Sequence, residues 1–526
     1  MIPLGLAEIA RVVDGTVYGA AGPGRTVTGP VVIDSREVTT GALFAAIAGA
    51  RSDGHDFAAA AYAAGAIAVL GSRPVDGPCV VADDVVTALA KLAGFVRDRL
   101  SPVVIGLTGS VGKTTTKDLL AQILEGEAPT VATSRSFNNE IGLPLTILRA
   151  GRRTRYLVLE MGAAKPGDIT HLVRVGRPRI GLVLNVGPAH VLTMGGIDGV
   201  AKTKGEMVRD LPAAAQGGVA LLNADDERVA AMAGQTRAAV TFYGTGADAA
   251  VRARDVTLDA AGHASFTLHT PGAQAPVRLC LPGQHQVANA LAAACAASAV
   301  GVPADRIADA LSSAVPRSPG RFEIKERPDG VTVIDDAYNA NPSSTQAAIR
   351  TLATMAAGRR TIAVIGEMMH QAEGTARQHE AIGTLAGALG LDVLVAVGQG
   401  EGPDAMAAAA RGTGVSVYAV PDGDAAIGLL RGSLRHYDLV FSNSLIEHVG
   451  GHERRERFAD TVHQLSGAYW VQTPYRYFPV EPHWHPARSF CPSRCAPKWS
   501  GAGRSPINTA SPGKRRCGPR SRSSQT

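Results

Sequence analysis

A glycine-rich stretch that could bind phosphate begins at residue 108 and reads Thr-Gly-Ser-Val-Gly-Lys-Thr-Thr. Its two glycines allow backbone N–H groups to turn toward an anion, Lys113 supplies a positive charge, and Thr114 can bind Mg²⁺. The common form of this loop has its first glycine where Leu107 stands, so the stretch is a variant of that form. The predicted nucleotide-binding residues of the loop are Gly109, Ser110, Val111, Gly112, Lys113, Thr114 and Thr115.

A strand and a helix stand on either side of this loop, as a phosphate-binding loop requires. The apolar run Val103–Leu107 predicts a buried strand, and the pattern from Thr116 to Leu124 predicts a helix whose N-terminus attracts the anion. Because both elements are present, nucleotide binding is favoured over a glycine-rich turn that binds nothing. The loop alone does not say whether ATP is hydrolysed, transferred or sensed.

Two further residues stand at the ends of predicted strands. Glu160 ends the apolar run that begins at Tyr156, and His190 follows the strand predicted at Gly181–Asn185. The carboxyl ends of parallel strands meet at one edge of a sheet, so we expect both side chains to lie near the loop, with Glu160 placed to hold Mg²⁺. The alternatives are a solvated or capping glutamate and a structural histidine.

Two stretches further along the chain contain polar residues that could belong to the same site. Lys202 and Lys204 lie close together, which by itself usually means a solvated helix face. The stretch from Asp335 to Pro342 places two acids and two amides at a strand end, and Pro342 is expected to begin the next helix. Strand context favours a functional interpretation of this stretch over a plain surface loop.

The positive net charge of +6 arises at the C-terminal end of the chain. Nine of the 52 Lys and Arg residues lie from Arg488 onward, and all 46 Asp and Glu residues precede it, which leaves 43 basic against 46 acidic residues, about −3. The body of the protein is therefore not basic, and we expect no nucleic-acid partner.

Cysteine usage and hydropathy point to a cytoplasmic protein. Cys79, Cys280 and Cys295 are far apart in the body and suggest neither disulfides nor a metal site, and the remaining three cysteines lie in the last forty residues. The first residues lack the order of a signal peptide, and no apolar run is long enough to cross a membrane. We expect a reducing cytoplasm and no membrane insertion.

The chain divides into α/β units in series. Residues 1–100 alternate short strands such as Val31–Ile33 with helical stretches such as Gly54–Ala68, and residues 101–316 contain the loop and its strands. Residues 317–433 form a third unit with strands at Val331–Ile334, Thr361–Ile365 and Val393–Val397. Buried parallel strands explain the continuous apolar runs.

Taken in order, these motifs resemble the Mur ligase family over roughly residues 1–430. The stretches that carry the resemblance are Thr108–Thr115, Glu160–Gly162, Asn185–His190, Lys202–Glu206, Gly283–Asn289, Gly320–Phe322 and Asp335–Ser343. Within the family, Asp34–Arg36, Gly41–Phe44, Asp53–His55, Ser136–Gly142 and Asp336–Pro342 most resemble the ligases that add D-alanyl-D-alanine to UDP-N-acetylmuramoyl-tripeptide.

The resemblance implies an α/β, three-domain architecture: a UDP-substrate-binding domain, a central P-loop ATPase domain and a Rossmann-like C-terminal domain. It implies a cytoplasmic enzyme of peptidoglycan precursor synthesis that is expected to act as a monomer. ATP and Mg²⁺ would be its cofactors, and UDP-N-acetylmuramoyl-tripeptide and D-alanyl-D-alanine its substrates. The tripeptide carboxylate would become an acyl phosphate that the dipeptide amine attacks.

The resemblance also implies roles for individual residues. The catalytic group would be Lys113, Glu160, His190 and Lys204. Metal ions would be held by Thr114, Glu160, His190 and a carbamylated Lys204, with Lys202 as the alternative lysine. ATP would further contact Asn289, Arg321, Asp336, Asn339 and Asn341. The UDP substrate would contact Ser35, Arg36, Asn138 and Asn139.

The resemblance ends near residue 433. A Lys-Ala/Gly-Ser-Arg stretch that normally closes the third domain of the family and helps to hold the incoming amino acid or dipeptide is absent, so the domain is expected to be truncated. Residues 434–487 resemble a fragment of an S-adenosylmethionine-dependent methyltransferase without its glycine-rich cofactor loop, so methyl transfer is not expected. Residues 488–526, rich in Pro, Ser and Arg, are expected to be a disordered basic tail.

Two alternatives remain open at this point. One is another amide ligase of the same superfamily, such as one that adds a diamino acid or a folate glutamate, although the stretch Asp336–Pro342 argues against both. The other is a nucleotide-binding relic that the altered C-terminus has inactivated.

Overall fold

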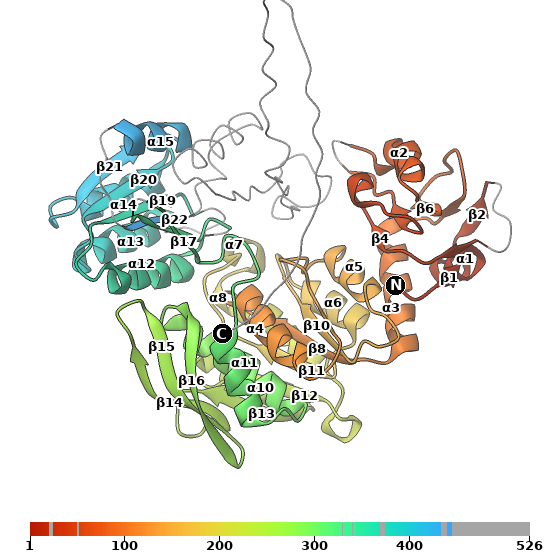
Figure 1. Ribbon diagram of the computed structural model, residues 1–526, viewed down its shortest axis with the longest axis horizontal. Helices are drawn as coiled ribbons and strands as arrows, with labels where there is room; N and C mark the ends of the chain where they lie inside the picture. The colour runs from red at the N-terminus through yellow and green to blue at the C-terminus, as the bar shows by residue number, and fades with distance from the viewer. Residues whose placement is uncertain are drawn as a thin grey trace, which may run out of the picture. The chain divides into compact units, whose positions relative to one another are not determined.

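The computed structural model describes residues 1–19, 25–49, 52–328, 330–338, 340–368, 374–432 and 439–443 (Figure 1). Within these ranges the chain forms three α/β domains in series, as the sequence predicts. Asn339, most of the predicted methyltransferase-like fragment and the predicted tail lie outside the described residues. No helix in the described ranges combines the length and apolar character needed to cross a membrane.

The N-terminal domain is built on a sheet with strand order β2-β7-β6-β5-β4. The central strands run parallel, and β2 pairs antiparallel at one edge. A small antiparallel pair, β1 with β3, adjoins it. The elements are β1 (Leu4–Gly5), α1 (Leu6–Val13), β2 (Thr16–Tyr18), β3 (Thr26–Val27), β4 (Val31–Val32), β5 (Leu43–Ala45), α2 (Ala58–Ala63), β6 (Ala68–Gly71), β7 (Cys79–Val81) and α3 (Val85–Leu100).

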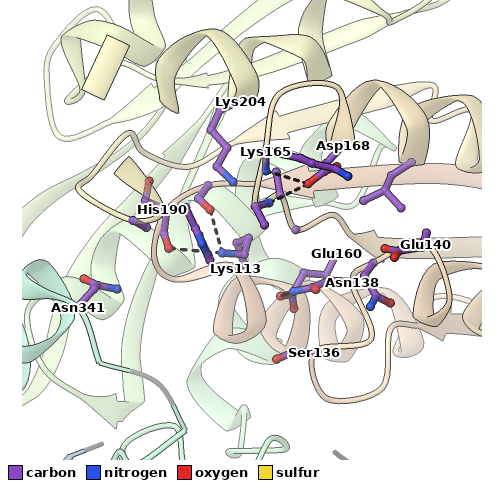
Figure 2. Close-up of a pocket in the computed structure, with 18 of the residues that line it drawn as sticks. Lys113, Ser136, Asn138, Glu140, Glu160, Lys165, Asp168, His190, Lys204 and Asn341 are labelled. Carbon is purple, nitrogen blue, oxygen red and sulfur yellow. Dashed lines mark hydrogen bonds between the residues drawn. The ribbon is translucent and has the colours of Figure 1, made fainter. Parts of the chain in front are cut away.

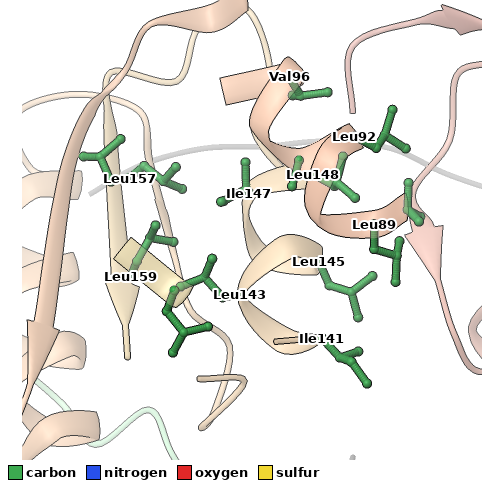
Figure 3. Close-up of a cluster of buried hydrophobic side chains, with 14 of the residues drawn as sticks. Leu89, Leu92, Val96, Ile141, Leu143, Leu145, Ile147, Leu148, Leu157 and Leu159 are labelled. Carbon is green, nitrogen blue, oxygen red and sulfur yellow. The ribbon is translucent and has the colours of Figure 1, made fainter. Parts of the chain in front are cut away.

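Helix α3 fastens this domain to the next one. The carboxylate of Asp84 accepts the Thr87 N–H at 2.7 Å and caps the helix start. Figure 3 shows its apolar side chains Leu89, Leu92 and Val96 beside α5 (Gly142–Leu148) of the central domain, in one buried cluster. Each fully buried leucine contributes about 1.5–3 kcal/mol, so a shared buried core stabilises the contact between the two domains.

The central sheet has the strand order β16-β15-β14-β13-β12-β11-β8-β10-β9. Strands from β9 to β14 run parallel. Strand β8 carries the P-loop and lies between β10 and β11, so the chain order reverses at its carboxyl end. This is the switch point at which α/β sheets bind ligands. The strands are β8 (Val103–Thr108), β9 (Thr130–Ala132), β10 (Tyr156–Glu160), β11 (Ile180–Val183), β12 (Val219–Asn223), β13 (Ala239–Gly244), β14 (Val251–Leu258), β15 (His263–Thr270) and β16 (Ala273–Pro282).

Helices cover this sheet. The antiparallel part of the sheet, β14–β16, packs against α11, and its strands are not predicted from the sequence. Helix α10 is packed by small side chains against the P-loop helix α4. The helices are α4 (Lys113–Glu125), α5, α6 (Asp168–Gly176), α7 (Val191–Met194), α8 (Ile197–Arg209), α9 (Glu227–Ala230), α10 (His285–Ala299) and α11 (Ala304–Ser313).

The third domain has the strand order β17-β18-β22-β19-β20-β21, with β17 antiparallel at the edge and the other strands parallel. Apolar helices complete its core. The elements are β17 (Glu323–Glu326), β18 (Thr332–Asp335), α12 (Pro342–Ala356), β19 (Thr361–Gly366), α13 (Thr375–Ala388), β20 (Val393–Val397), α14 (Glu401–Ala410), β21 (Ser416–Val420), α15 (Gly423–Gly432) and β22 (Leu439–Asn443).

Strand β22 corrects the predicted end of this domain. The boundary predicted from the sequence is residue 433, but β22 pairs with β18 on one side and with β19 on the other. Phe441 is fully buried and Val440 is half-buried, as suits a strand inside the sheet. The domain therefore extends to Asn443 at least, into the segment predicted to be a methyltransferase-like fragment.

The linker into the third domain is bound along α4. Three α4 side chains, each about one turn from the next, hydrogen-bond to residues 315–318, and one of these contacts is a two-fold Arg–Glu ion pair. The pairs are Asp118 with Ser318 (2.6 Å), Gln122 with Val315 (3.0 and 3.1 Å) and Glu125 with Arg317 (2.6 and 2.8 Å). The helix that starts at the P-loop thus also holds the start of the third domain.

Candidate active site

The P-loop joins the end of β8 to the start of α4. Gly112 has φ +79°, and a Cβ at this position would lie 2.2 Å from Oδ1 of Asn289. Only glycine therefore fits here. Gly112 is the N-cap of α4, and no side chain caps this helix end. The first N–H groups of α4 and the positive end of its dipole are consequently suited to an anion.

Lys113 follows as the first residue of α4. Its Nζ donates to the carbonyl oxygens of Gly109 at 2.9 Å and Ser110 at 3.4 Å. Burial lowers the pKa of Lys113, with a further lowering from the nearby Arg321 and an opposing effect of Glu160. A phosphate beside this ammonium would stabilise its positive charge, which burial otherwise disfavours.

A cavity of about 740 Å³ opens at this loop (Figure 2). All four predicted catalytic residues line it, and they come from different strand ends and helices of the central domain. Predicted site residues that line the cavity are Gly109, Ser110, Lys113, Asn138, Asn139, Glu160, His190, Lys204, Arg321 and Asn341. The structure thus brings together residues that are up to 232 positions apart, from Gly109 to Asn341.

Glu160 lies at the end of β10 and is 1% exposed. Its Oε1 accepts hydrogen bonds from Thr114 Oγ1 at 3.3 Å and from Asn138 Nδ2 at 2.8 Å. Its Oε2 is buried and has no hydrogen-bond partner among the described residues. A buried carboxylate oxygen without a partner is costly, and a cation would satisfy it.

The donor set suits Mg²⁺ bound together with phosphate. Across the described ranges, no group of three His, Cys, Asp or Glu side chains is arranged to hold a metal ion. Mg²⁺ is usually bound by one or two carboxylates, waters and substrate phosphates rather than by a cage of protein ligands. Glu160 with the Thr114 hydroxyl fits this requirement.

The structure distinguishes the two candidate lysines on α8. Lys204 is 2% exposed and lines the cavity, whereas Lys202 is exposed to solvent. Burial, and to a lesser extent the neighbouring Lys113, lowers the pKa of Lys204 to about 7. A neutral amine is therefore accessible at neutral pH, which carbamylation by CO₂ requires.

His190 lies on the P-loop side of the cavity, next to Lys113 in Figure 2. It is the N-cap of the short helix α7 and has φ +57°, an uncommon conformation for a residue with a side chain. Residues held in this conformation cluster at functional sites. His190 therefore lies near the P-loop, as predicted from the sequence, and its function stays a prediction.

The third domain contributes one wall of the cavity. The Arg321 guanidinium lies 3.9 Å from the centre of the Tyr338 ring, and Nη2 of Arg321 is 3.5 Å from Oγ of Ser136. Asn341 lines the cavity and also caps α12, because its Oδ1 accepts the Ser344 N–H at 3.0 Å. Pro342 begins α12, as predicted.

Other predicted residues lie away from the cavity lining. Asn289 is buried against Gly112 of the P-loop, and Asp336 accepts the N–H of Phe322 at 3.1 Å. Ser35 and Arg36 lie in the N-terminal domain, where Arg36 pairs with Asp34 at 2.6 Å. The loop residues Val111, Gly112, Thr114 and Thr115 support the lining without forming part of it.

The structure also adds residues that the sequence analysis does not select. Ser136 hydrogen-bonds to Thr114 at 3.2 Å, and Lys165, Asp168, His171 and Tyr338 line the cavity. Ser136 and Tyr338 fall inside motifs that the sequence analysis names, so the motifs were a usable signal for them. Nothing in the spacing around Lys165 or His171 points to a site.

Models of the Mur ligase family match nearly the whole described chain. The matching models are the Mur ligase middle domain at residues 107–297, the Mur ligase glutamate ligase domain at residues 320–442, and the Mur ligase family catalytic domain at residues 30–93. The second match includes almost all of β22, in agreement with the pairing of that strand.

Curated relatives share the same name. The UDP-N-acetylmuramoyl-tripeptide–D-alanyl-D-alanine ligase of Mycobacterium tuberculosis is 44% identical over 485 residues, which covers 84% of this chain and 94% of the relative. The Escherichia coli enzyme of that name is 36% identical over 404 residues, covering 76% and 87%.

Solved structures agree with these relatives. A crystal structure of MurF from Acinetobacter baumannii has a TM-score of 0.74 at 30% identity and covers 84% of this chain and 96% of its own. MurF of Thermotoga maritima in complex with ADP has a TM-score of 0.68 at 28% identity, covering 83% and 98%. The chain therefore belongs to the Mur ligase family, among the UDP-N-acetylmuramoyl-tripeptide–D-alanyl-D-alanine ligases.

Proposed function

We propose that this chain uses ATP to join D-alanyl-D-alanine to UDP-N-acetylmuramoyl-tripeptide in the cytoplasmic synthesis of peptidoglycan precursor. The observation that carries the proposal is the single cavity in which Lys113, Glu160, His190 and Lys204 meet beside an uncapped helix N-terminus. Relatives that are 44% and 36% identical carry this activity in their names.

The charge of the cavity supports the transfer of a phosphoryl group to a carboxylate. Lys113, Lys204 and Arg321 line one cavity. Burial lowers the pKa values of both lysines, and repulsion adds to this effect, from Arg321 at Lys113 and from Lys113 at Lys204. A triphosphate and a carboxylate are both anions, so their approach requires such neutralisation. The tripeptide carboxylate then attacks the γ-phosphorus, and ADP leaves.

Mg²⁺ would be held by Thr114 and Glu160, and a second ion by His190 and carbamylated Lys204. Metal ions at these positions would neutralise the phosphate oxygens. The chain's own residues orient the reactants: Asn138 fixes the Glu160 carboxylate, and Asn139 lines the same wall of the cavity. Arg321, from the third domain, lines the same cavity.

The amine of D-alanyl-D-alanine would attack the carbonyl carbon of the acyl phosphate, and phosphate would leave from the tetrahedral intermediate. Exclusion of water protects the acyl phosphate from hydrolysis, and the wall supplied by Arg321, Tyr338 and Asn341 contributes to that exclusion. We place UDP binding in the N-terminal domain near Ser35 and Arg36, and we propose that the enzyme acts as a monomer.

An oxygen-isotope experiment tests the acyl phosphate. UDP-N-acetylmuramoyl-tripeptide labelled with ¹⁸O in the terminal carboxylate should transfer one ¹⁸O atom to the released phosphate, because a carboxylate oxygen becomes the bridging oxygen of the intermediate. Phosphate release should require both substrates. Release without either substrate would indicate an ATPase, and unlabelled phosphate would exclude the acyl phosphate.

The Lys113→Ala variant serves as the control for the nucleotide site. It should abolish phosphate release while UDP-tripeptide binding persists, because Lys113 lies on the P-loop. If the variant released phosphate at the rate of the unaltered enzyme, the assignment of residues 108–115 as the nucleotide-binding loop would be wrong.

A further inference from the structure

The side-chain amide of Asn185 is bound to the P-loop. Asn185 follows β11, the strand next to β8, and its Oδ1 accepts the N–H groups of Ser110 at 3.0 Å and Val111 at 2.9 Å. Its Nδ2 donates to the carbonyl oxygen of Val111 at 3.1 Å. The amide thus pairs with both polar groups of Val111, which requires a donor and an acceptor on one short side chain.

A second pair of contacts joins the same two segments. Oγ of Ser110 donates to the Gly187 carbonyl at 3.1 Å, and the Gly187 N–H donates back to this oxygen at 2.8 Å. The backbone carbonyl of Asn185 also accepts the Ser110 N–H at 3.1 Å. The segment from Asn185 to Gly187, which leads to His190, is therefore hydrogen-bonded to the P-loop at both of its ends.

These bonds divide the N–H groups of the P-loop into two sets. Those of Ser110 and Val111 are bound to Asn185, whereas the helix start at Gly112 and Lys113 has no side-chain cap. An anion is then directed to the helix start, where the dipole and Lys113 also act. A loop without the amide would have to order these groups when the nucleotide binds, which weakens binding.

We propose that Asn185 is a positioning residue for the nucleotide, which holds the P-loop in its phosphate-binding shape and ties it to the His190 segment. This inference rests on the proposed use of ATP by the same site. Asn185 itself does not line the cavity, so its effect on the nucleotide acts through the loop.

The Asn185→Asp variant gives the sharpest test, because aspartate has nearly the same shape but cannot donate to the Val111 carbonyl. Binding of ADP to the full-length protein is measured by titration calorimetry without added metal, and binding of UDP-N-acetylmuramoyl-tripeptide is measured separately. We expect ADP binding to weaken about 100-fold in Asn185→Asp and about 10-fold in Asn185→Ala. Binding of the UDP substrate should stay unchanged.

Asn223 offers a matched control on the next strand, β12. Like Asn185 it carries a side-chain amide at the end of a strand, and it is 8% exposed. Its Nδ2 donates to the carbonyl oxygen of Leu184 at 2.9 Å, and its Oδ1 accepts the N–H of Asp225 at 3.0 Å. Within the described part of the chain it makes no hydrogen bond to the P-loop, so Asn223→Asp should change the ADP Kd by less than about threefold.

Unchanged ADP affinity in Asn185→Asp would overturn the inference, as would an equal loss in Asn223→Asp. If Asn185→Asp fails to bind the UDP substrate, its fold is disturbed and Asn185→Ala becomes the deciding variant, with unchanged ADP affinity again overturning the inference. Failure of the unaltered protein to bind ADP would instead overturn the proposed function.

Discussion

The cavity concentrates buried charge on a few side chains. Lys204 is 2% exposed, and Glu160 is 1% exposed with one oxygen that lacks a partner in the described part of the chain. Each residue would be unfavourable in an ordinary core, because a buried charge needs compensation. Their proximity to the P-loop is explained if phosphate, metal ions and a modified lysine supply that compensation.

We expect Lys204→Arg to lose at least about 100-fold in ligase turnover, because arginine remains protonated and cannot form a carbamate. Lys204 can do so above pH 7, where its lowered pKa leaves the amine mainly neutral, so turnover should fall as the pH decreases below 7. Phosphate release with both substrates provides the measurement.

Lys202→Arg is the matched control on the same helix, since Lys202 is exposed. It should retain turnover within about twofold. The assignment of Lys204 would be wrong if the two variants behaved alike.

Helix α4 contacts three parts of the site: the P-loop, the linker into the third domain and the loop that leads to Ser136. Its N-terminus carries Lys113, and one face holds the linker at residues 315–318. Lys117, 1% exposed, donates to the carbonyl oxygens of Thr133 at 2.7 Å and Arg135 at 3.0 Å and pairs with Asp118 at 2.8 Å. The loop that leads to Ser136 and Asn138 is therefore supported from within this helix.

We expect Lys117→Met to lower the free energy of unfolding by about 3 kcal/mol, because it leaves Asp118 without its buried partner. The double variant with Asp118→Asn should lose less than the single variant, since it removes the unpaired charge. Urea unfolding of the variants provides the measurement.

Arg306→Ala supplies the comparison, because the pair between Arg306 and Glu127 is largely exposed and is worth at most about 1 kcal/mol. A double variant that is no more stable than Lys117→Met would contradict the role given to the Asp118 charge.

The elements also show what the sequence could predict. Continuous apolar runs identified β8, β10, β11, β18, β19 and β20 because parallel strands are buried on both faces. Strands β14–β16 were missed, since β15 alternates buried and half-buried residues in a sheet with one open face. The predicted helix Gly54–Ala68 is a 3₁₀ turn at Gly54–Phe57 followed by the shorter α2.

The positions of some site residues could also be predicted from the sequence, and those of others could not. Residues at strand ends, such as Glu160 and His190, could be placed because sheet topology brings such ends together. Lys165 and His171 line the cavity through contacts between distant segments, which spacing along the chain does not reveal. Residue type does not show which of Lys202 and Lys204 belongs to the site, since both are lysines. Their burial on α8 does, because Lys204 is buried and Lys202 is exposed.

In the full chain, the basic segment begins at a different residue from the one at which the third domain was predicted to end. The basic residues that raise the sequence pI to about 9.0 are concentrated from Arg488 onward. The third domain, in contrast, needs Leu439–Asn443, because β22 separates β18 from β19. The predicted end of the resemblance, near residue 433, is therefore not the end of the folded domain, and the family match likewise extends to residue 442.

We expect a chain that ends at Ala487 to keep ligase turnover within about twofold, and a chain that ends at residue 433 to lose at least about 100-fold. Without β22, strands β18 and β19 would be about 10 Å apart and could not pair. Phosphate release with both substrates and urea unfolding measure the two effects. Full turnover in the shorter chain would contradict the need for β22.

The central position of β22 has a consequence for the newly made protein. A ribosome completes β18 and β19 well before it reaches Leu439, so both strands wait with one edge unpaired while the intervening residues are translated. Open strand edges pair readily with other chains. Slow decoding between Gly366 and Leu439 would therefore prolong the period in which nascent chains can associate, and rapid decoding would shorten it.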